Sequence, residues 1–509
     1  MTHRPRRVAL VLATVGGLGA AAGAVGALRR RRGAGHAYPH HHIAATARGS
    51  RNAAMAKLAG QVGASTAAHR ARRVFASAVR RDALDEEAQL RTAEQVASTL
   101  GNMKGALMKL GQIASFIDDA LPEPVREALA QLQQDAPPMS AELAAGVVER
   151  ELGAGPDRVF AEWDPVPIAA ASIGQVHRAM THDGRAVAVK VQYPGVDEAV
   201  RADLANLQLA GSGLGQLFPG LDADAMVAEL RARLVEELDY TIEASNQRLF
   251  AGWYRGHPTI TVPAVVDEHS SRRVLTTDLA AGARFDEMLT WDQAERDLAG
   301  ETVYRFVFRS LYRFHAFNGD PHPGNYLFSG EGRVTFLDFG LVKRLGPTDV
   351  GLLFDMVRAS VIDHDPARMR RACEAAGFIT PGAPVADERV AAFMGVFWEA
   401  IRPDEPTTIT AEWASQVARR YLGRAEFGDV MEYAAMPPSF VVLQRINLGL
   451  LAILGRLEAT ANWRRVAEEL WPTDAAPSTP LGEAEARWWR TAHGQAGPAA
   501  SRVATGLDT

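Results

Sequence analysis

The spacing of hydrophobic and polar residues changes several times along the chain, and each change predicts a different kind of element. Between about residues 53 and 132, apolar positions recur at helical spacing among Ala, Leu, Arg, Glu and Gln, with no proline before Pro122. The order of the later patterns predicts an α+β fold with a largely helical C-terminal half. These later patterns are a helix at 141–152, strands at 167–179, 185–194 and 274–279, a helix at 225–250, and mostly helices from 348 to about 470.

The N-terminus carries an uncharged run at 8–28 with arginines on both sides, and it is long enough to cross a bilayer. Its Ala and Gly content would drive insertion only weakly. A signal anchor, a cleaved signal peptide and a start placed too far upstream are all compatible with it. As an anchor, it would leave the following chain in the cytoplasm, because the four arginines at 29–32 favour retention there.

Two stretches near the C-terminus are also distinctive. The apolar run that follows Pro437 and Pro438 is interrupted by Arg445, which favours a buried helix over a membrane span. From 472 to 509, Pro, Ala, Gly and Ser prevail, and this predicts mostly disorder. The pair Trp488-Trp489 is expected to anchor a short helix there.

Composition removes several functional classes. The chain has 509 residues and a net charge of -5, which gives no reason to expect nucleic acid as its main partner. Its single cysteine, Cys373, excludes an intramolecular disulfide framework and a thiolate metal cluster. A reducing compartment fits this cysteine usage.

The most informative stretch lies at 318–340. Asp320 is followed five residues later by Asn325, and Asp338 comes directly before Phe339 and Gly340. ATP phosphoryl transfer in the protein-kinase fold needs such a set, in which one carboxylate orients or deprotonates the acceptor while an Asn and the Asp before Phe-Gly hold magnesium. An isolated Asp-Phe-Gly tripeptide is weak evidence for such a site. The full spacing of Asp320, Asn325 and Asp338 between two strand-like runs is specific, and it favours a phosphoryl-transfer site over a merely polar hairpin.

An upstream lysine fits the same chemistry. Val187 to Lys190 has the form of the third-strand motif whose lysine pairs with the α- and β-phosphates. The turn before it, where backbone amides would approach the phosphates, is expected at Ala169, Ala170, Ala171 and Ser172. Methyl groups there make the loop stiffer and more crowded than a glycine-rich one.

The helix predicted at 225–250 supplies candidate partners for the lysine. Asp239, Glu243 and Asn246 fall on one helical face, whereas Glu237 lies off that face and would meet a different cation. After the strand at 274–279, Thr277 and Asp278 lead into a hinge whose backbone groups would hold adenine.

These motifs resemble the ABC1/UbiB family of atypical protein-kinase-like proteins over roughly residues 88–463. In that family the K-x-G-Q helix folds over the active site and its lysine meets the E-x-D acids. The resemblance therefore assigns Glu237 to Lys109 and Glu243 to Lys190, and it implies a role in isoprenoid quinone biosynthesis or membrane lipid homeostasis. The matching residues are Lys109, Gly111 and Gln112 for K-x-G-Q, Ala169–Ser172 for the Ala-rich loop, Lys190, Glu237 and Asp239 for E-x-D, and Asp320, Asn325 and Asp338.

Two departures from ordinary protein kinases concern the acceptor. Gly319 stands where most protein kinases carry an arginine before the catalytic Asp. After Gly340 the chain returns to a helix at about Thr348, without an A-P-E element or a long loop. A platform for an extended peptide is therefore not expected.

We predict a two-lobed protein-kinase-like α+β fold with an added N-terminal helical extension. The expected function is Mg-dependent ATP binding with slow hydrolysis or phosphoryl transfer. A non-enzymatic, nucleotide-gated lipid-binding or scaffold protein is the alternative, and the motifs disfavour a small-molecule kinase of the aminoglycoside type. The expected segments are an apolar segment and linker (1–50), the helical extension (51–139), an N-lobe (140–280), a C-lobe (281–471) and a tail (472–509).

Overall fold

The structure is a computed structural model that describes residues 139–171, 173–196, 238–422, 424–435, 437–473 and 475–493. The chain divides into two compact units. Among the described residues, the first unit contains 139–158, 163–177, 190–196 and Leu238, and the second contains 159–162, 178–189 and everything from Asp239 onward. The described residues mix helices and strands, so the expected α+β class is confirmed.

Five strands form a sheet whose hydrogen-bonded order is β1, β3, β4, β6, with β2 paired to β3. On β4, Val187, Val189 and Val191 are fully buried, because alternate side chains of a strand point to the same face. The expected strands are thereby confirmed. Their bounds are β1 Glu162–Trp163, β2 Ala169–Ala171, β3 Gly174–Met180, β4 Ala186–Gln192 and β6 Val274–Asp278.

The helix expected at 141–152 is α6, Ala141–Leu152, with the same bounds. Ser140 caps its first turn by accepting a hydrogen bond from the Leu143 N–H, and Gly153 ends it in a left-handed conformation. In the same unit the Gln175 side chain accepts from the Met139 N–H at 2.8 Å and donates to the Met139 carbonyl at 3.3 Å. Gln175 thus ties the start of α6 to β3.

The helix predicted at 225–250 is corrected by the structure. Its described part, α10, runs over Tyr240–Trp253, and Leu238 and Asp239 precede it in non-helical conformations. Asp239 is the N-cap, whose carboxylate accepts a hydrogen bond from the Thr241 N–H at 3.0 Å. A capping carboxylate competes with helix continuation, so the helix begins after this residue.

Short strands surround the stretch that sequence analysis singled out. The two strand-like runs of this stretch are β8, Tyr326–Ser329, and β9, Arg333–Phe336, which pair antiparallel. β5, Ile260–Thr261, pairs with β9 in parallel. β7, Ala316–Asn318, pairs antiparallel with β10, Val342–Arg344, so that Asn318 lies opposite Val342.

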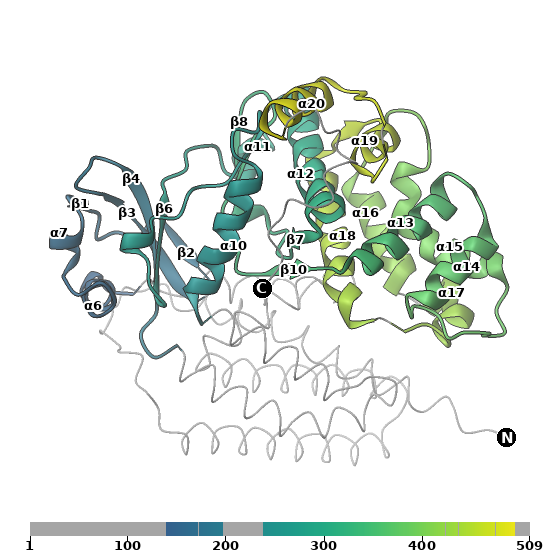
Figure 1. The fold of residues 1–509 in the computed structure, drawn as a ribbon, viewed down its shortest axis with the longest axis horizontal. Helices are drawn as coiled ribbons and strands as arrows, with labels where there is room; N and C mark the ends of the chain where they lie inside the picture. The colour runs from purple at the N-terminus through teal and green to yellow at the C-terminus, as the bar shows by residue number, and fades with distance from the viewer. Residues whose placement is uncertain are drawn as a thin grey trace, which may run out of the picture. The chain divides into compact units, whose positions relative to one another are not determined.

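Helices make up most of the second unit (Figure 1). As expected, the chain returns to a helix soon after Gly340, since α13 begins at Pro347. The short elements are α7 Pro156–Val159, η2 Asp267–His269, α11 Phe285–Met288, η3 Pro323–Asn325, η4 Val396–Ile401, β11 Thr407–Thr408 and β12 Thr460–Ala461. The longer helices are α12 Gln293–Phe314, α13 Pro347–Val361, α14 Pro366–Ala375, α15 Asp387–Gly395, α16 Ala411–Leu422, α17 Arg424–Met431, α18 Pro438–Leu457, α19 Trp463–Leu470 and α20 Pro480–His493.

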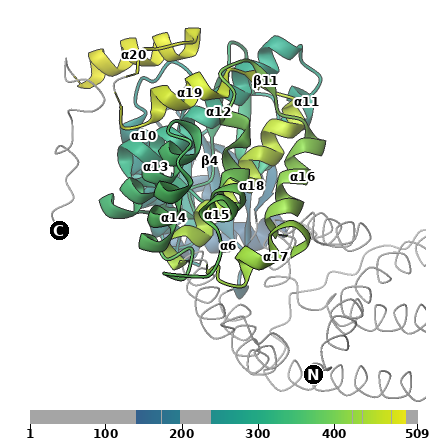
Figure 2. The same cartoon turned by 90° about the vertical axis from the view of Figure 1, so that its right-hand side faces the viewer.

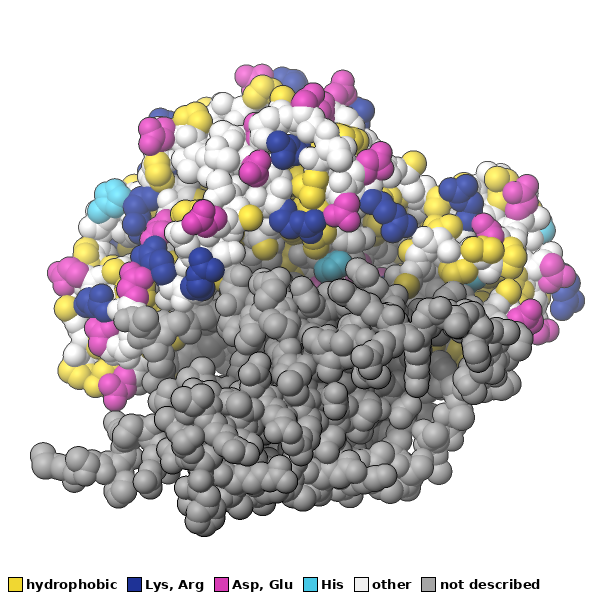
Figure 3. Space-filling view, turned by 180° about the vertical axis from the view of Figure 1, so that it is seen from behind, with side chains coloured by type: hydrophobic (Ala, Val, Ile, Leu, Met, Phe, Trp, Pro, Cys, Tyr) yellow, Lys and Arg dark blue, Asp and Glu magenta, His cyan; other side chains and the backbone are white. Residues whose placement is uncertain are grey.

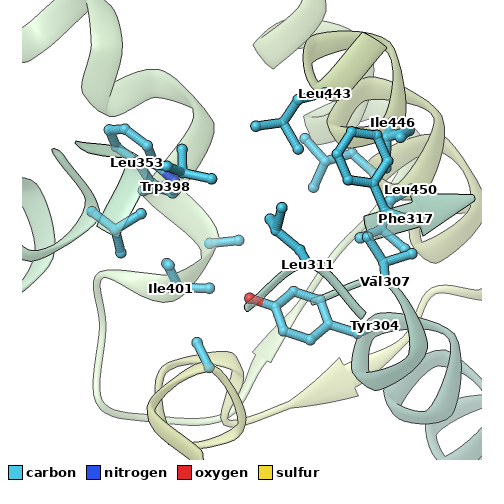
Figure 4. Close-up of a cluster of buried hydrophobic side chains, with 14 of the residues drawn as sticks. Tyr304, Val307, Leu311, Phe317, Leu353, Trp398, Ile401, Leu443, Ile446 and Leu450 are labelled. Carbon is cyan, nitrogen blue, oxygen red and sulfur yellow. The ribbon is translucent and has the colours of Figure 1, made fainter. Parts of the chain in front are cut away.

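The core of this unit lies between α12, α13, η4 and α18 (Figure 4). Leu311, Ile446 and Leu450 are at most 2% exposed. α18 runs beside α16 (Figure 2), and this burial confirms the buried helix that was expected over the apolar run. No helix among the described residues is long and apolar enough to span a membrane. The run at 8–28 lies outside those residues, so the anchor stays a prediction.

The C-terminal segment differs from the expected disorder. Trp488 and Trp489 do lie on a helix, α20, which extends over Pro480–His493. Trp489 is 4% exposed, and the Trp488 Nε1–H donates to the Arg255 carbonyl at 3.0 Å. Residues 494–509 lie outside the described part. On the face drawn in Figure 3, charges of both signs are interspersed with apolar side chains, which is the distribution of an ordinary protein surface.

Candidate active site

The loop that carries Asp320 is held from both sides by Asn318, at the end of β7. The Asn318 side-chain oxygen accepts a hydrogen bond from the Asp320 N–H at 3.0 Å. Its amide nitrogen donates to the main-chain carbonyl of Asp338. One buried side chain, 8% exposed, therefore links the two acidic residues of the predicted site.

Asp320 and Asn325 are brought together by the tight turn between them. The His322 N–H donates to the Asp320 carbonyl at 2.8 Å, and the Asn325 N–H donates to the His322 carbonyl at 2.9 Å. The Asn325 side-chain nitrogen lies 3.1 Å from both the Asp320 carbonyl and its Oδ2. The five-residue spacing thus becomes a direct contact.

The Asp-Phe-Gly stretch forms a turn beside this loop. The Gly340 N–H donates to the Asp338 Oδ1 at 2.9 Å. The Gly319 N–H donates to the Leu341 carbonyl at 2.6 Å and continues the pairing of β7 with β10. Phe339 is fully buried, and its ring centroid lies 4.9 Å from that of Phe250 on α10. The backbone ladder and a buried ring therefore fix where Asp338 sits.

Helix α10 contacts the same turn through the face that sequence analysis identified. The Asn246 side chain donates to the Phe339 carbonyl at 3.1 Å. Glu243 is 5% exposed, and a methyl group placed on Gly340 would lie 3.7 Å from its Oε2. The structure therefore brings Glu243 and Asn246 to the turn formed by Phe339 and Gly340, whereas Asp239 caps the helix and lies 3.7 Å from Arg272.

The Ala-rich segment is corrected from a turn to a strand. Ala169–Ala171 form β2, and Ala170 pairs with Gln175 of β3. Between β2 and β3, Ile173 lies in a turn, and Ser172 lies outside the described part. Lys190 is the fifth residue of β4 and is partly buried.

The predicted adenine hinge begins at the end of β6. The Asp278 carboxylate bonds to Arg185 and accepts from the Ala264 N–H at 3.3 Å. The N–H groups of Asp278 and Leu279 donate to main-chain carbonyls at 2.9 and 3.0 Å. A base would therefore contact other groups of this stretch, and the role of Thr277 and Asp278 stays a prediction.

Several predicted residues lie outside the described part of the chain. They are Lys109, Gly111 and Gln112 of the extension, and Glu237. Conversely, sequence analysis did not find Asn318. An Asn two residues before an Asp is typical of side-chain-to-backbone turns, and that local signal was available.

The side-chain oxygens of Asn325 and Asp338 are suitable ligands for magnesium bound together with a nucleotide. The Asn325 amide nitrogen faces Asp320, which turns its oxygen to the opposite side of the amide group. With Asp338 this offers oxygen ligands, which magnesium prefers. Within the described ranges no group of three or more His, Cys, Asp and Glu could hold a metal ion by itself. Magnesium usually takes one or two carboxylates and completes its shell with water and phosphate oxygens.

Comparisons with known proteins match this chain to ABC1-type atypical kinases. A family model described as the ABC1 atypical kinase-like domain matches residues 131–373. The mitochondrial atypical kinase COQ8B of Danio rerio is 34% identical over 49% of this chain and 40% of its own length. The chloroplastic activity of BC1 complex kinase 1 of Arabidopsis thaliana is 33% identical over 59% of this chain and 45% of its own length. The matched part thus spans less than half of either relative.

A solved structure extends the comparison to the fold. It is the complex of Rv3197 with erythromycin from Mycobacterium tuberculosis, 34% identical, with a TM-score of 0.58. The match covers 78% of this chain and all of that one. The expected kinase-like fold is confirmed.

Proposed function

Because the chain belongs to the ABC1 atypical kinase-like family, we propose that it binds Mg-ATP and slowly hydrolyses it or transfers its γ-phosphoryl group. The observation that carries this proposal is the pair of contacts made by Asn318 and Asn325. They place the carboxylate of Asp320, the amide of Asn325 and the Asp338 turn in one connected group. Such a group suits a reaction in which positioning and charge stabilisation supply most of the rate.

Each residue has a distinct proposed role. Asp320 accepts the proton of the acceptor hydroxyl or orients a water molecule, and it is only partly buried. Asn325 and Asp338 supply oxygen ligands to magnesium, which when bound neutralises charge on the phosphates. Lys190 contacts the α- and β-phosphates, and Glu243 fixes Lys190. The hinge into which Thr277 and Asp278 lead holds the base through backbone groups other than the N–H groups of Asp278 and Leu279.

A thermal-shift experiment tests the site. In the wild type, Mg and ATP together should raise the melting temperature, whereas Mg alone should have little effect because the nucleotide completes the metal shell. Asp338→Asn should remove the Mg-dependent part of the shift and leave the melting temperature of the free protein nearly unchanged. Equal protection of the variant and the wild type by Mg-ATP would contradict the site assignment.

The biological role that we propose is regulation of isoprenoid quinone biosynthesis or membrane lipid homeostasis, with association at a membrane through 8–28. The proposal draws on the 34% identity to the mitochondrial atypical kinase COQ8B of Danio rerio. Quinone and lipid profiling of a deletion strain tests it. Complementation by the wild type but not by Asp338→Ala is expected, and unchanged profiles on deletion would contradict the role.

A second candidate function is non-enzymatic binding of a lipophilic molecule, gated by nucleotide. The observation that favours it is the solved complex of Rv3197 with erythromycin, whose whole chain is covered by the match. Asp320→Asn separates the two functions. A binding protein would retain its cellular function and its nucleotide-dependent affinity for the lipophile in this variant, whereas an enzyme would lose turnover and function together.

A further inference from the structure

Helix α18 carries a glycine against the loop that holds Asp320. A β-carbon added at Gly449 would lie 2.4 Å from the Pro321 Cγ, 3.2 Å from its Cβ and 3.6 Å from its carbonyl oxygen. Carbon atoms in ordinary contact are about 3.5–4.0 Å apart. Pro321 is buried and directly follows Asp320. The absence of a side chain at Gly449 therefore leaves the space that the Pro321 ring occupies.

A glycine at this place is not explained by helix formation. Glycine inside a helix destabilises the folded state by about 1 kcal/mol relative to alanine, because it loses more conformational freedom on folding. Gly449 lies well inside α18, which extends over Pro438–Leu457. Its backbone has no left-handed conformation that would require glycine. The close approach of Pro321 is the feature that requires it.

Helix α18 is held more rigidly than the loop that carries Pro321. Ile446, Leu450 and Leu454 of α18 are at most 2% exposed. A second glycine of the helix, Gly455, is packed against α16, because an added β-carbon would lie 3.0 Å from both the Thr410 carbonyl oxygen and the Ala411 Cα. A side chain at Gly449 would therefore displace the loop more readily than the helix. The proline ring is cyclised onto the backbone and cannot rotate away.

Displacement of Pro321 would reach both functional groups of the loop. The carbonyl of Asp320, in the peptide bond to Pro321, accepts hydrogen bonds from the His322 N–H at 2.8 Å and from the Asn325 side chain at 3.1 Å. A shift of this peptide therefore moves Asp320 and Asn325 together. An ordinary carbon contact at Gly449 would need a shift of about 1 Å.

We propose that Gly449 is a positioning residue. It sets how closely the Asp320–Asn325 loop approaches α18, because it lets the Pro321 ring pack directly against the helix. The inference rests on the proposed phosphoryl-transfer function for its kinetic consequence, but not for the contact. Gly449 itself touches no substrate. Its effect passes through Pro321 to the carboxylate that orients the acceptor.

The test compares Gly449→Ala with Gly351→Ala. Gly351 lies inside α13, and an added β-carbon there meets no atom within 4 Å. Gly449→Ala should lower kcat for ATP turnover by about 10²-fold, as expected for a misplacement of about 1 Å. The KM for ATP should stay within about 3-fold, and kcat in Gly351→Ala should stay at the wild-type level. Gly449→Ala with wild-type kcat would overturn the inference.

A double variant distinguishes positioning from general damage. Pro321→Ala removes the Cγ that the new methyl group would meet, so Gly449→Ala combined with Pro321→Ala should be at least about 10-fold more active than the product of the single effects predicts. Strictly multiplicative effects would overturn the inference. If Gly449→Ala alone does not fold, the double variant should fold, and failure of both would count against the contact.

Hydrogen exchange separates this inference from the proposed function. Without nucleotide, the amides of 319–325 should exchange faster in Gly449→Ala than in the wild type, and they should be unchanged in Gly351→Ala. If the wild-type protein neither binds nor turns over ATP, the proposed function is wrong. In that case the exchange rates alone decide, and unchanged exchange at 319–325 would overturn the positioning role.

Discussion

Two groups of charged side chains in the second unit are held in different ways. Arg305 of α12 is 1% exposed, and its guanidinium contacts Glu301 at 2.7 Å, Glu469 at 2.7 Å and Glu485 at 2.9 Å. Arg309 adds a second contact to Glu485 at 2.8 Å. In the candidate site, Asp320 and Asp338 are only partly buried, and the contacts described above join them to backbone and amide groups.

The comparison distinguishes buried ion pairs, which stabilise the fold, from partly exposed carboxylates, which stay accessible to solvent. A buried charge that loses its partner is expensive, so the Arg305 cluster stabilises the fold only while all members are present. A partly buried carboxylate keeps part of its hydration, so it is cheaper to maintain and can still approach a cation or a proton. Charge in the Arg305 cluster therefore joins α12, α19 and α20, whereas Asp320 and Asp338 are only partly buried, which suits the ligand-binding role that we propose for them.

The largest expected effect is on stability, from the buried cluster. Glu485→Ala leaves Arg305 and Arg309 without a shared carboxylate and should lower the free energy of unfolding by about 3–5 kcal/mol. Glu483 lies on the same helix, in an exposed pair with Arg487 at 3.6 Å, so Glu483→Ala should cost less than about 1 kcal/mol. Urea denaturation measures both. Equal losses would remove the distinction between buried and exposed charge.

The next effect is on activity and leaves stability nearly unchanged. Asp320→Asn removes the proton acceptor but retains the shape of the side chain, so turnover should fall by about 10²-fold or more. The free energy of unfolding should change by less than about 1 kcal/mol, because the carboxylate is partly exposed. A steady-state ATPase assay and urea denaturation on the same samples give both values. A large loss of stability with intact turnover would reverse the comparison.

A smaller effect is the dependence of the cluster on pH. Burial would raise the pKa of Glu485, but Arg309, His257 and Arg305 outweigh burial and hold it well below the ordinary value of 4.5. A carboxylate with a lowered pKa in the folded state stabilises that state above its unfolded pKa, and this stabilisation is lost as the pH falls through the folded pKa. The difference in unfolding free energy between wild type and Glu485→Gln should therefore be constant from pH 7 to about pH 5.5 and shrink below about pH 4.5.

Urea denaturation at several pH values measures this difference. Glu483→Gln is the control, and its difference from wild type should stay small throughout. A difference for Glu485→Gln that grows as the pH falls would have the wrong sign and would contradict a lowered pKa.

Local sequence signals predicted the parts of the site that are local in structure. The spacing of Asp320 and Asn325 became a direct contact. Of the face predicted for Asp239, Glu243 and Asn246, the last two lie on α10, because three residues nearly complete a helical turn, whereas Asp239 precedes the helix. The start of α10 was wrong, although an Asp is a preferred N-cap and Asp239 could have been interpreted as one. The turn expected at Ala169–Ser172 was placed too early, because Ala169–Ala171 pair with β3 and form part of the strand that was also expected over 167–179.

Contacts between distant segments had no such signal. Gly449 and Pro321 meet only after α18 packs beside the loop, and nothing in either local sequence indicates the other. The same holds for Glu485, whose partners lie on α12. The composition of 472–509 indicated disorder, but buried ion pairs and Trp489 stabilise a helix over Pro480–His493. Sequence patterns therefore predicted the fold class and the closeness of Asp320 and Asn325, but not the distant residues that pack against their loop.

The smallest expected effect concerns the Ala-rich strand. Ala170 is exposed on β2 and pairs with Gln175, so Ala170→Gly should cost about 0.5–1 kcal/mol of stability through added backbone freedom. If this hairpin approaches the phosphates, the same freedom should also change nucleotide affinity by a few-fold and raise autophosphorylation. Ala169→Gly and Ala171→Gly belong in the same series, because the pairing with β3 does not single out one of the three positions.

Ala161→Gly is the matched control, since Ala161 is an exposed alanine whose N–H donates to the Met180 carbonyl at the end of β3. It should lose a similar amount of stability without a change in nucleotide affinity, because Met180 lies at the opposite end of β3 from the residues that pair with β2. Calorimetric titration with Mg-ATP and an autophosphorylation assay compare the four variants with the wild type. If all three β2 variants behave like Ala161→Gly, the alanines only complete the pairing with β3, and the hairpin has no part in setting nucleotide affinity.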